Sequence, residues 1–234
     1  MEAGASAEEV KKDRLKMIRV LFLGSSSHAS VLSDAMNLME NFDVIGYLDD
    51  TVPVDTLKRG YPVLGGFKDI EAVCKRERCR DIVIAFGDNF WRRKVLNELI
   101  PDGINFPVIK HPSAIVASSA NVGRGSVLLA NSHIGRGTVV GDFCVINTGS
   151  SIDHDCNLAS FSSIAPGVFT GGLVEVGECS HIGVGACISD RKKIGKHTVV
   201  GTGSVVVRDI PDFVVAYGNP AKVKRSRAAG EKFL

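Results

Sequence analysis

The chain has no long hydrophobic run, no strong charge of either sign and no paired cysteine motif. No apolar stretch approaches the roughly 18 residues of a membrane-spanning helix, so no membrane span is expected. A net charge of +2 gives no argument for binding nucleic acid or a membrane surface. Residues 1–16 are polar and charged, unlike a secretory signal. None of the six cysteines forms a CxxC motif, which favours a reducing cytoplasm with neither disulfides nor a metal site.

What the chain does have is a period of six. From Val116 to Val206 every sixth residue is Val, Ile or Leu, with the single exception of Thr170, and this frame has sixteen positions. Helices repeat at 3.6 residues and strands at 2, so neither explains it. The period is typical of a parallel β-helix, in which each short strand contributes one inward side chain and then turns. The residues one and four places after each frame position are mostly small, as tight recurring turns require.

The first half of the chain follows a different pattern. Apolar strands alternate with helical stretches, which predicts a small parallel α/β domain, Rossmann-like in its alternation. The expected strands are residues 18–23, 44–48, 61–64, 82–86 and 104–109, and the expected helices run from the 24–29 turn to about residue 40, near 68–78, and from about 90 to 99. We therefore expect a leader over 1–16, flexible or helical, an α/β domain over 17–110, a β-helix over 111–217 and a C-terminal tail over 218–234.

Three polar segments follow strands of the expected sheet, where ligands of parallel sheets bind. They are the turn Gly24–His28, the pair Asp49–Asp50 and the segment Gly87–Asn89. The turn has one glycine and three serines, so it is no dinucleotide fingerprint. Its amides and hydroxyls at a helix N-terminus suit a phosphate, although plain helix capping and an ordinary loop at the aspartates are alternatives.

One of the six histidines stands out. His154 is flanked by carboxylates in the segment Asp153-His154-Asp155. A reaction that moves a proton near neutral pH needs a base, and imidazole, with an unperturbed pKa of about 6.5, is the natural choice. Asp155 would fix the tautomer of the imidazole. The alternative is that His154 is an exposed side chain on a solvated turn and has no catalytic role.

The hexad resembles the left-handed β-helix of the hexapeptide-repeat acyltransferases. In that family three hexads make one eighteen-residue triangular coil, and the proteins are usually trimeric with acyl-CoA bound between neighbouring β-helices. Together with the Gly24-x-x-x-His28 turn, the Asp49–Asp50 pair and the Gly87–Asn89 segment, the chain resembles the nucleotide-sugar N-acetyltransferases that make bacterial acetamido sugars such as the bacillosamine precursor. Sialic-acid O-acetyltransferase-like proteins share this architecture.

The resemblance implies a nucleotide sugar on the α/β domain. Ser26, Ser27 and His28 would meet the pyrophosphate, and Asp49 and Asp50 would hydrogen-bond a pyrimidine base. Asn89 is implied as a further substrate-binding residue.

The resemblance also assigns the chemistry to the β-helix. His154 and Asp155 match the family's catalytic pair, with Asp in place of the more usual Glu. In eighteen-residue coils His154 stacks on Gly172 at about 4.8 Å, and the Gly172 amide would meet the acetyl carbonyl. Many relatives carry a second histidine nine residues after the first, where this chain has Ser163; His181, which stacks on Ser163, would substitute.

The acetyl-CoA side is implied to involve further residues near the end of the β-helix. Gly218-Asn219-Pro220-Ala221 resembles the Gly-x-Pro-Ala closure of CoA-using hexapeptide enzymes, and a basic cluster follows it. The implied set on the acetyl-CoA side is Ser163, Gly172, His181, Gly201, Pro220 and Lys222.

The sequence thus predicts a cytoplasmic, homotrimeric, acetyl-CoA-dependent N-acetyltransferase with active sites between subunits. Its expected acceptor is a UDP-4-amino-4,6-dideoxy sugar, acetylated directly with His154 as general base and without a metal. Alternatives are a dTDP- or GDP-linked amino sugar, O-acetylation of sialic acid, and a non-catalytic β-helix scaffold.

Overall fold

The computed structural model describes residues 17–39 and 41–232, so the expected leader over 1–16 lies outside the described residues. The chain divides into two compact units. The first contains the chain up to Ala85 together with Ile100–Asn105, and the second contains Phe86–Leu99 together with the chain from Phe106 onward. No helix in the described part of the chain is long and apolar enough to cross a membrane.

The first unit is built on a five-stranded sheet in the order β3-β4-β2-β1-β5. Its strands are β1 (Ile18–Leu23), β2 (Phe42–Leu48), β3 (Leu57–Lys58), β4 (Tyr61–Gly65) and β5 (Asp81–Ile84). Its helices are α2 (Ser27–Asn37), the 3-10 turn η1 (Phe67–Asp69) and α3 (Ile70–Glu77). All pairings are parallel except β3 with β4, and residues 20–23 of the central strand β1 are fully buried. The expected strand–helix alternation is confirmed.

The boundary between the units differs from the expected one at residue 110. Helix α4 (Asn89–Leu99) belongs to the second unit, because its buried side chains hydrogen-bond to coils of the β-helix. Of the expected strand 104–109, only Ile109–Lys110 is a strand, β6, and it pairs with a β-helix strand rather than with the α/β sheet.

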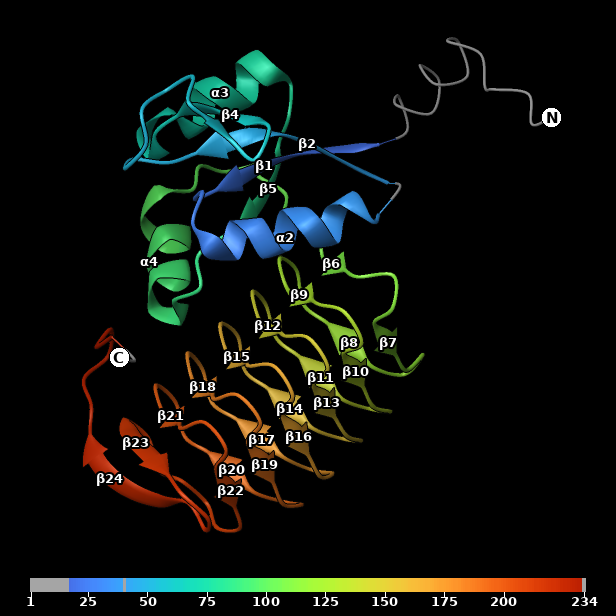
Figure 1. Cartoon of the computed structure of the whole chain (residues 1–234), viewed down its shortest axis with the longest axis vertical. Helices are drawn as coiled ribbons and strands as arrows, with labels where there is room; N and C mark the ends of the chain where they lie inside the picture. The colour runs from blue at the N-terminus through green and yellow to red at the C-terminus, as the bar shows by residue number, and fades with distance from the viewer. Residues whose placement is uncertain (1–16, 40, 233–234) are drawn as a thin grey trace, which may run out of the picture. The chain divides into compact units, whose positions relative to one another are not determined.

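The second unit is a parallel β-helix made of two-residue strands on three faces (Figure 1). Face 1 contains β7 (Ile115–Val116), β10 (His133–Ile134), β13 (Ser151–Ile152), β16 (Phe169–Thr170), β19 (Cys187–Ile188) and β22 (Val205–Val206). Face 2 contains β8 (Asn121–Val122), β11 (Val139–Val140), β14 (Asn157–Leu158), β17 (Glu175–Val176) and β20 (Lys193–Ile194). Face 3 contains β6, β9 (Val127–Leu128), β12 (Val145–Ile146), β15 (Ser163–Ile164), β18 (His181–Ile182), β21 (Val199–Val200), β23 (Val214–Tyr217) and β24 (Lys222–Ser226).

Each strand from β7 to β22 ends on a position of the six-residue frame. Up to β19 the partner in the next coil lies eighteen residues on, as Ser163 pairs with His181, whereas β21 pairs with β23 sixteen residues on. The frame side chains point inward and form one continuous core. The predicted fold class, an α/β domain followed by a left-handed β-helix, is confirmed.

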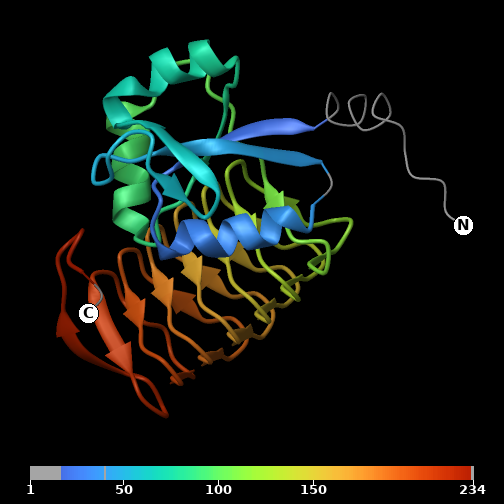
Figure 2. The same ribbon diagram turned by 45° about the horizontal axis from the view of Figure 1, so that its top comes forward.

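The C-terminal end of the β-helix is closed by a hairpin. Strand β23 runs parallel to β21, and β24 pairs antiparallel with β23, as the red end of Figure 2 shows. Residues 222–226, expected within a tail, are therefore a strand.

Candidate active site

His154 lies in the corner between β13 and β14, on a turn that places Asp155 at a left-handed backbone conformation (φ 55°). This turn lets two consecutive side chains meet: Nδ1 of His154 is 2.9 Å from Oδ2 of Asp155. The same carboxylate oxygen accepts a longer bond of 3.4 Å from Arg136. When Asp155 accepts a hydrogen bond from Nδ1–H, Nε2 keeps its lone pair and is able to accept a proton.

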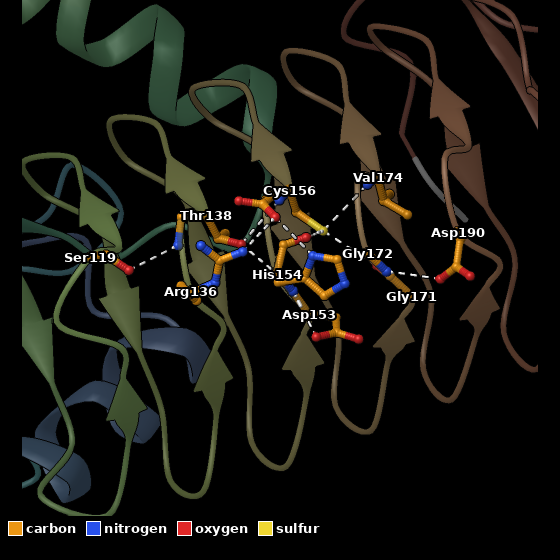
Figure 3. Close-up of polar contacts among 12 residues, drawn as sticks. Ser119, Arg136, Thr138, Asp153, His154, Cys156, Gly171, Gly172, Val174 and Asp190 are labelled. Atoms are coloured by element: carbon orange, nitrogen blue, oxygen red, sulfur yellow. Dashed lines mark hydrogen bonds and ion pairs between the residues drawn. The ribbon is translucent and has the colours of Figure 1, made fainter.

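The Nε2 atom of His154 is directed at the next coil (Figure 3). A Cβ atom built on Gly172 would lie 2.5 Å from Nε2, which is closer than a side chain can approach. The expected stacking of His154 on Gly172 is therefore confirmed. A glycine is required here to leave the imidazole in place.

Thr170, the one lapse in the frame, supports this corner. In regular coils the residue after a frame position donates its N–H to the frame carbonyl of the next coil, as Gly135 does to Ile152 at 2.8 Å. The N–H of Asp153 donates instead to the Thr170 hydroxyl at 3.1 Å. The hydroxyl therefore holds the turn that carries His154.

The Gly172 amide is already occupied. Its N–H donates to Oδ1 of Asp190 at 2.9 Å, from the coil beyond (Figure 3). The expectation of an exposed amide ready for the acetyl carbonyl is corrected by this bond. The sequence analysis did not predict a role for Asp190, although this residue follows His154 by thirty-six positions and therefore lies in the same corner two coils later.

Ser163 and Asn89 belong to a buried network rather than to an open binding site. The Ser163 hydroxyl donates to Oδ1 of Asn89 at 2.6 Å, and the Asn89 amide donates to the Ser180 carbonyl at 2.9 Å. Both side chains are buried. Their polar atoms are engaged inside the protein, and the expectations that Asn89 binds substrate and that Ser163 lies on the acetyl-CoA side stay predictions.

The centre of that network is Arg92, on α4. Its guanidinium is almost fully buried and donates six hydrogen bonds, to Asn89 Oδ1, Ser163 Oγ and the carbonyls of Phe86, Gly87, Phe143 and Phe161. Burial lowers the pKa of Arg92 to about 10. No pattern in the sequence marked this residue, because three of its partners lie 51 to 71 residues away on the β-helix.

His181, opposite Ser163 on β18, is affected by the same buried charge. Burial, together with the positive charges of Arg92 and Arg227, lowers the pKa of His181 to about 4. The imidazole is therefore neutral at pH 7. Its expected role on the acetyl-CoA side stays a prediction.

Asp49 and Asp50 of the first unit differ in burial and in hydrogen bonding. Asp49 is buried, and its two carboxylate oxygens accept four hydrogen bonds of 2.6–2.8 Å from the backbone and hydroxyl groups of Ser25 and Thr51. Burial alone would raise the pKa of Asp49, but these bonds lower it overall. Asp49 therefore shapes the Gly24–Ser25 turn, and its expected contact with a nucleotide base stays a prediction. Asp50 is exposed, and its Oδ1 accepts the Phe67 N–H at 2.7 Å.

The expected phosphate-binding residues lie at the start of α2. Ser26 is the N-cap residue, and its hydroxyl donates to the Ala85 carbonyl at 3.2 Å. Ser27 is exposed, and His28, in the first helical turn, is half-buried. The exposed backbone end of α2 and the Ser27 hydroxyl are the polar groups that this turn presents.

Near the hairpin, Pro220 and Lys222 line an open cavity of about 500 Å³ together with Arg208. Arg208 follows β22 in the same corner as His154, three coils later. Gly201 lies against Tyr217, where a Cβ would come within 2.7 Å of the tyrosine Cβ.

Among the described residues, Glu178, Cys179 and His197 form a cluster whose ligand atoms lie within 4.8 Å of one another. Glu178 is ion-paired with Arg93 at 3.2 Å. Burial raises the pKa of Cys179 to about 11, which opposes the thiolate that a metal needs. The cluster does not suit a cation.

Comparisons with known proteins cover both units. A family model described as the PglD N-terminal domain matches residues 19–99. A GDP-perosamine N-acetyltransferase of Escherichia coli O157:H7 is 30% identical over 150 residues, which is 61% of this chain and 67% of that protein.

Two solved structures match most of the chain. The acetyltransferase domain of PglB from Neisseria gonorrhoeae FA1090 is 34% identical, with a TM-score of 0.82 over 88% of this chain and 100% of that one. PerB from Caulobacter crescentus, solved in complex with CoA and GDP-perosamine, is 34% identical with a TM-score of 0.82, over 88% of this chain and 97% of that one.

Proposed function

Because the chain belongs to the hexapeptide-repeat nucleotide-sugar N-acetyltransferases, we propose that it transfers the acetyl group of acetyl-CoA to the amine of a UDP-4-amino-4,6-dideoxy sugar. Membership in this family of acyltransferases counts against the non-catalytic scaffold alternative. Acetyl-CoA is the co-substrate, as expected from relatives solved with CoA or acetyl-CoA bound.

The observation that carries the proposal is the His154–Asp155 pair beside Gly172. Asp155 holds the Nδ1–H of His154, so Nε2 accepts a proton from the acceptor's ammonium group. His154 passes this first proton to solvent, and the free amine attacks the thioester carbonyl to form the C–N bond. His154 then takes the second proton from the nitrogen, the C–S bond breaks, and the departing CoA sulfur takes that second proton, so the products are a neutral amide and the CoA thiol. Transfer is direct, because burial raises the pKa of the nearby thiols of Cys144 and Cys156 and makes both poor nucleophiles.

The charged end of acetyl-CoA suits the cavity beside the hairpin. Arg208 and Lys222 supply positive charge for phosphates, and Pro220 supplies an apolar wall. The Gly172 amide is not assigned to the oxyanion, since Asp190 holds it.

The choice of nucleotide rests on Asp50. One of its oxygens is used by the Phe67 N–H, which leaves the other for one donor. A single acceptor matches the lone N3–H of uracil or thymine, whereas guanine presents two adjacent donors that suit a bidentate carboxylate. The pyrophosphate would lie at the N-terminus of α2, near Ser26, Ser27 and His28.

The similarity to PerB favours a GDP-linked sugar as the second candidate. A panel of UDP-, dTDP- and GDP-linked 4-amino sugars, together with sialic acid, separates the candidates when acetyl-CoA turnover is followed by release of the free thiol. We expect the highest kcat/KM with the UDP-linked amine. A higher kcat/KM with the GDP-linked amine would replace uracil by guanine as the assigned nucleobase. Turnover on no amine would overturn the proposed function.

We further propose that the protein works as a homotrimer in the cytoplasm. Face 1 exposes large apolar side chains, among them Ile115 at 64% and Phe169 at 54%, as expected of a surface that packs against another copy. The six free cysteines suit a reducing compartment. Analytical ultracentrifugation is expected to give three times the 25.0 kDa chain mass, and a monomer at micromolar concentration would contradict the trimer.

A further inference from the structure

We propose that Asp190 selects an amine over a hydroxyl acceptor by binding the ammonium group of the sugar beside His154. This inference rests on the proposed function and assigns a substrate contact to a residue outside the His154–Asp155 pair.

The first argument is geometric. His154, Gly172 and Asp190 occupy one corner in three successive coils, eighteen residues apart. A Cβ on Gly172 would collide with Nε2 of His154, and a Cβ on Gly171 would collide with Oδ1 of Asp190. The imidazole and the carboxylate therefore approach the same Gly171–Gly172 dipeptide from the coils on either side (Figure 3). The two glycines are what allow both groups to be there.

The second argument is charge. Asp155, Asp142 and Glu175 are each paired with a basic side chain: Arg136, Arg124 and Lys193. Asp190 is exposed and, within residues 17–39 and 41–232, has no such ion pair; its Oδ1 accepts a hydrogen bond from the neutral Gly172 N–H. Its negative charge is therefore free to attract a cation that arrives beside His154.

The acceptor's chemistry fits this arrangement. A primary ammonium carries three N–H donors, so it donates to Nε2 of His154 and to the Asp190 carboxylate at the same time. A hydroxyl has one proton, and once that is given to His154 the oxygen lone pairs face a carboxylate. The arrangement favours the amine through hydrogen bonds and charge together, and disfavours the hydroxyl through repulsion.

The contribution belongs to acceptor binding rather than to turnover. Negative charge near the developing oxyanion does not stabilise the transition state, whereas it does stabilise the bound ammonium. Loss of the Asp190 charge is therefore expected to change the acceptor's Kd and KM more than kcat.

Asp190→Asn tests the proposal, because asparagine keeps an oxygen for the Gly172 N–H and removes the charge. The ligands are the UDP-linked 4-amino sugar and the UDP sugar with a hydroxyl in its place, titrated into the CoA-loaded protein by calorimetry. We expect the Kd of the amino sugar to rise tenfold or more, and the Kd of the hydroxyl sugar to stay unchanged or to fall. The KM for acetyl-CoA and the Tm are expected to stay as in the parent protein.

Asp142→Asn is the matched control, since Asp142 is another corner aspartate that lies over a glycine, Gly123, of the preceding coil. It is expected to change neither Kd. An unchanged amino-sugar Kd in Asp190→Asn, equal losses for both sugars, or a rise in kcat would overturn the proposal; the last result would assign Asp190 as a restraint on the Gly172 amide. If the parent protein neither binds nor acetylates any amino sugar, the proposed function itself fails, which is a different result.

Discussion

Nε2 of His154 lies so close to Gly172 that a single added methyl group would displace the imidazole. The two residues are eighteen positions apart and meet because each coil of the β-helix stacks on the one before. Asp155 thus fixes the proposed base at Nδ1, and the glycine of the next coil leaves room for the ring near Nε2.

Removal of the base is the first prediction. His154→Ala is expected to lower kcat by about 10²- to 10⁴-fold, the usual contribution of a general base, while the affinity for acetyl-CoA is kept. Asp155→Asn is expected to give a smaller loss, because the imidazole remains but its tautomer is no longer fixed. Steady-state kinetics with acetyl-CoA binding by calorimetry check both, and near-normal turnover of His154→Ala would reject the assignment.

The second prediction concerns the glycine beside the base. Gly172→Ala is expected to push the imidazole aside and to lower kcat about 100-fold, the scale of a catalytic group misplaced by 1 Å. Gly87→Ala is the control, because a Cβ there has no neighbour within 4 Å, and its kcat is expected to match the parent protein. Equal kcat values for the two variants would show that the contact at Gly172 is relieved without cost to catalysis.

The third prediction compares neighbouring arginines on α4. Arg92→Met leaves the buried polar partners of the guanidinium without donors, so we expect a loss of about 3 kcal/mol or more in the free energy of unfolding. Arg93→Met removes a half-exposed ion pair with Glu178, which is worth about 1 kcal/mol at most. Urea denaturation at matched protein concentration measures both. Similar losses would mean that Arg92 does not anchor α4.

The fourth prediction is a dependence of stability on pH. An unfolded histidine titrates near pH 6.5, whereas His181 in the folded protein has a pKa of about 4. Between these values the unfolded state binds more protons, so the stabilisation is complete above pH 6.5 and is lost as the pH falls toward 4. The loss is up to about 3 kcal/mol, from 1.36 kcal/mol per unit of pKa shift.

His181→Asn removes that titration and serves as the comparison. The difference in unfolding free energy between pH 7 and pH 4.5 is expected to be smaller in the variant than in the parent protein. The same difference in both proteins would show that His181 is protonated as easily in the folded protein as in the unfolded one.

Much of the β-helix and its candidate site followed from the period of six. In a solenoid each coil contacts its neighbours, so a position in sequence fixes the position in space. This is why the stacking of His154 on Gly172 and of Ser163 on His181 was correctly predicted.

Three expected ligand-binding residues share a feature that sequence reasoning missed. Asn89, Ser163 and Asp49 are residue types that bind ligands, but each is used up by hydrogen bonds inside the protein. Whether a polar side chain is free depends on what packs against it. For Ser163 that partner is Arg92, 71 residues earlier and on a helix outside the repeat.

The sequence by itself therefore determined the coil, its register and the place of the His154–Asp155 pair, because those depend on local spacing that repeats without interruption. Only the tertiary structure decided which polar groups are engaged within the protein, because hydrogen-bond partners come from any distance along the chain. It shows Asn89 and Ser163 in internal hydrogen bonds and the Gly172 amide bonded to Asp190, whose carboxylate the spacing alone had left unremarked.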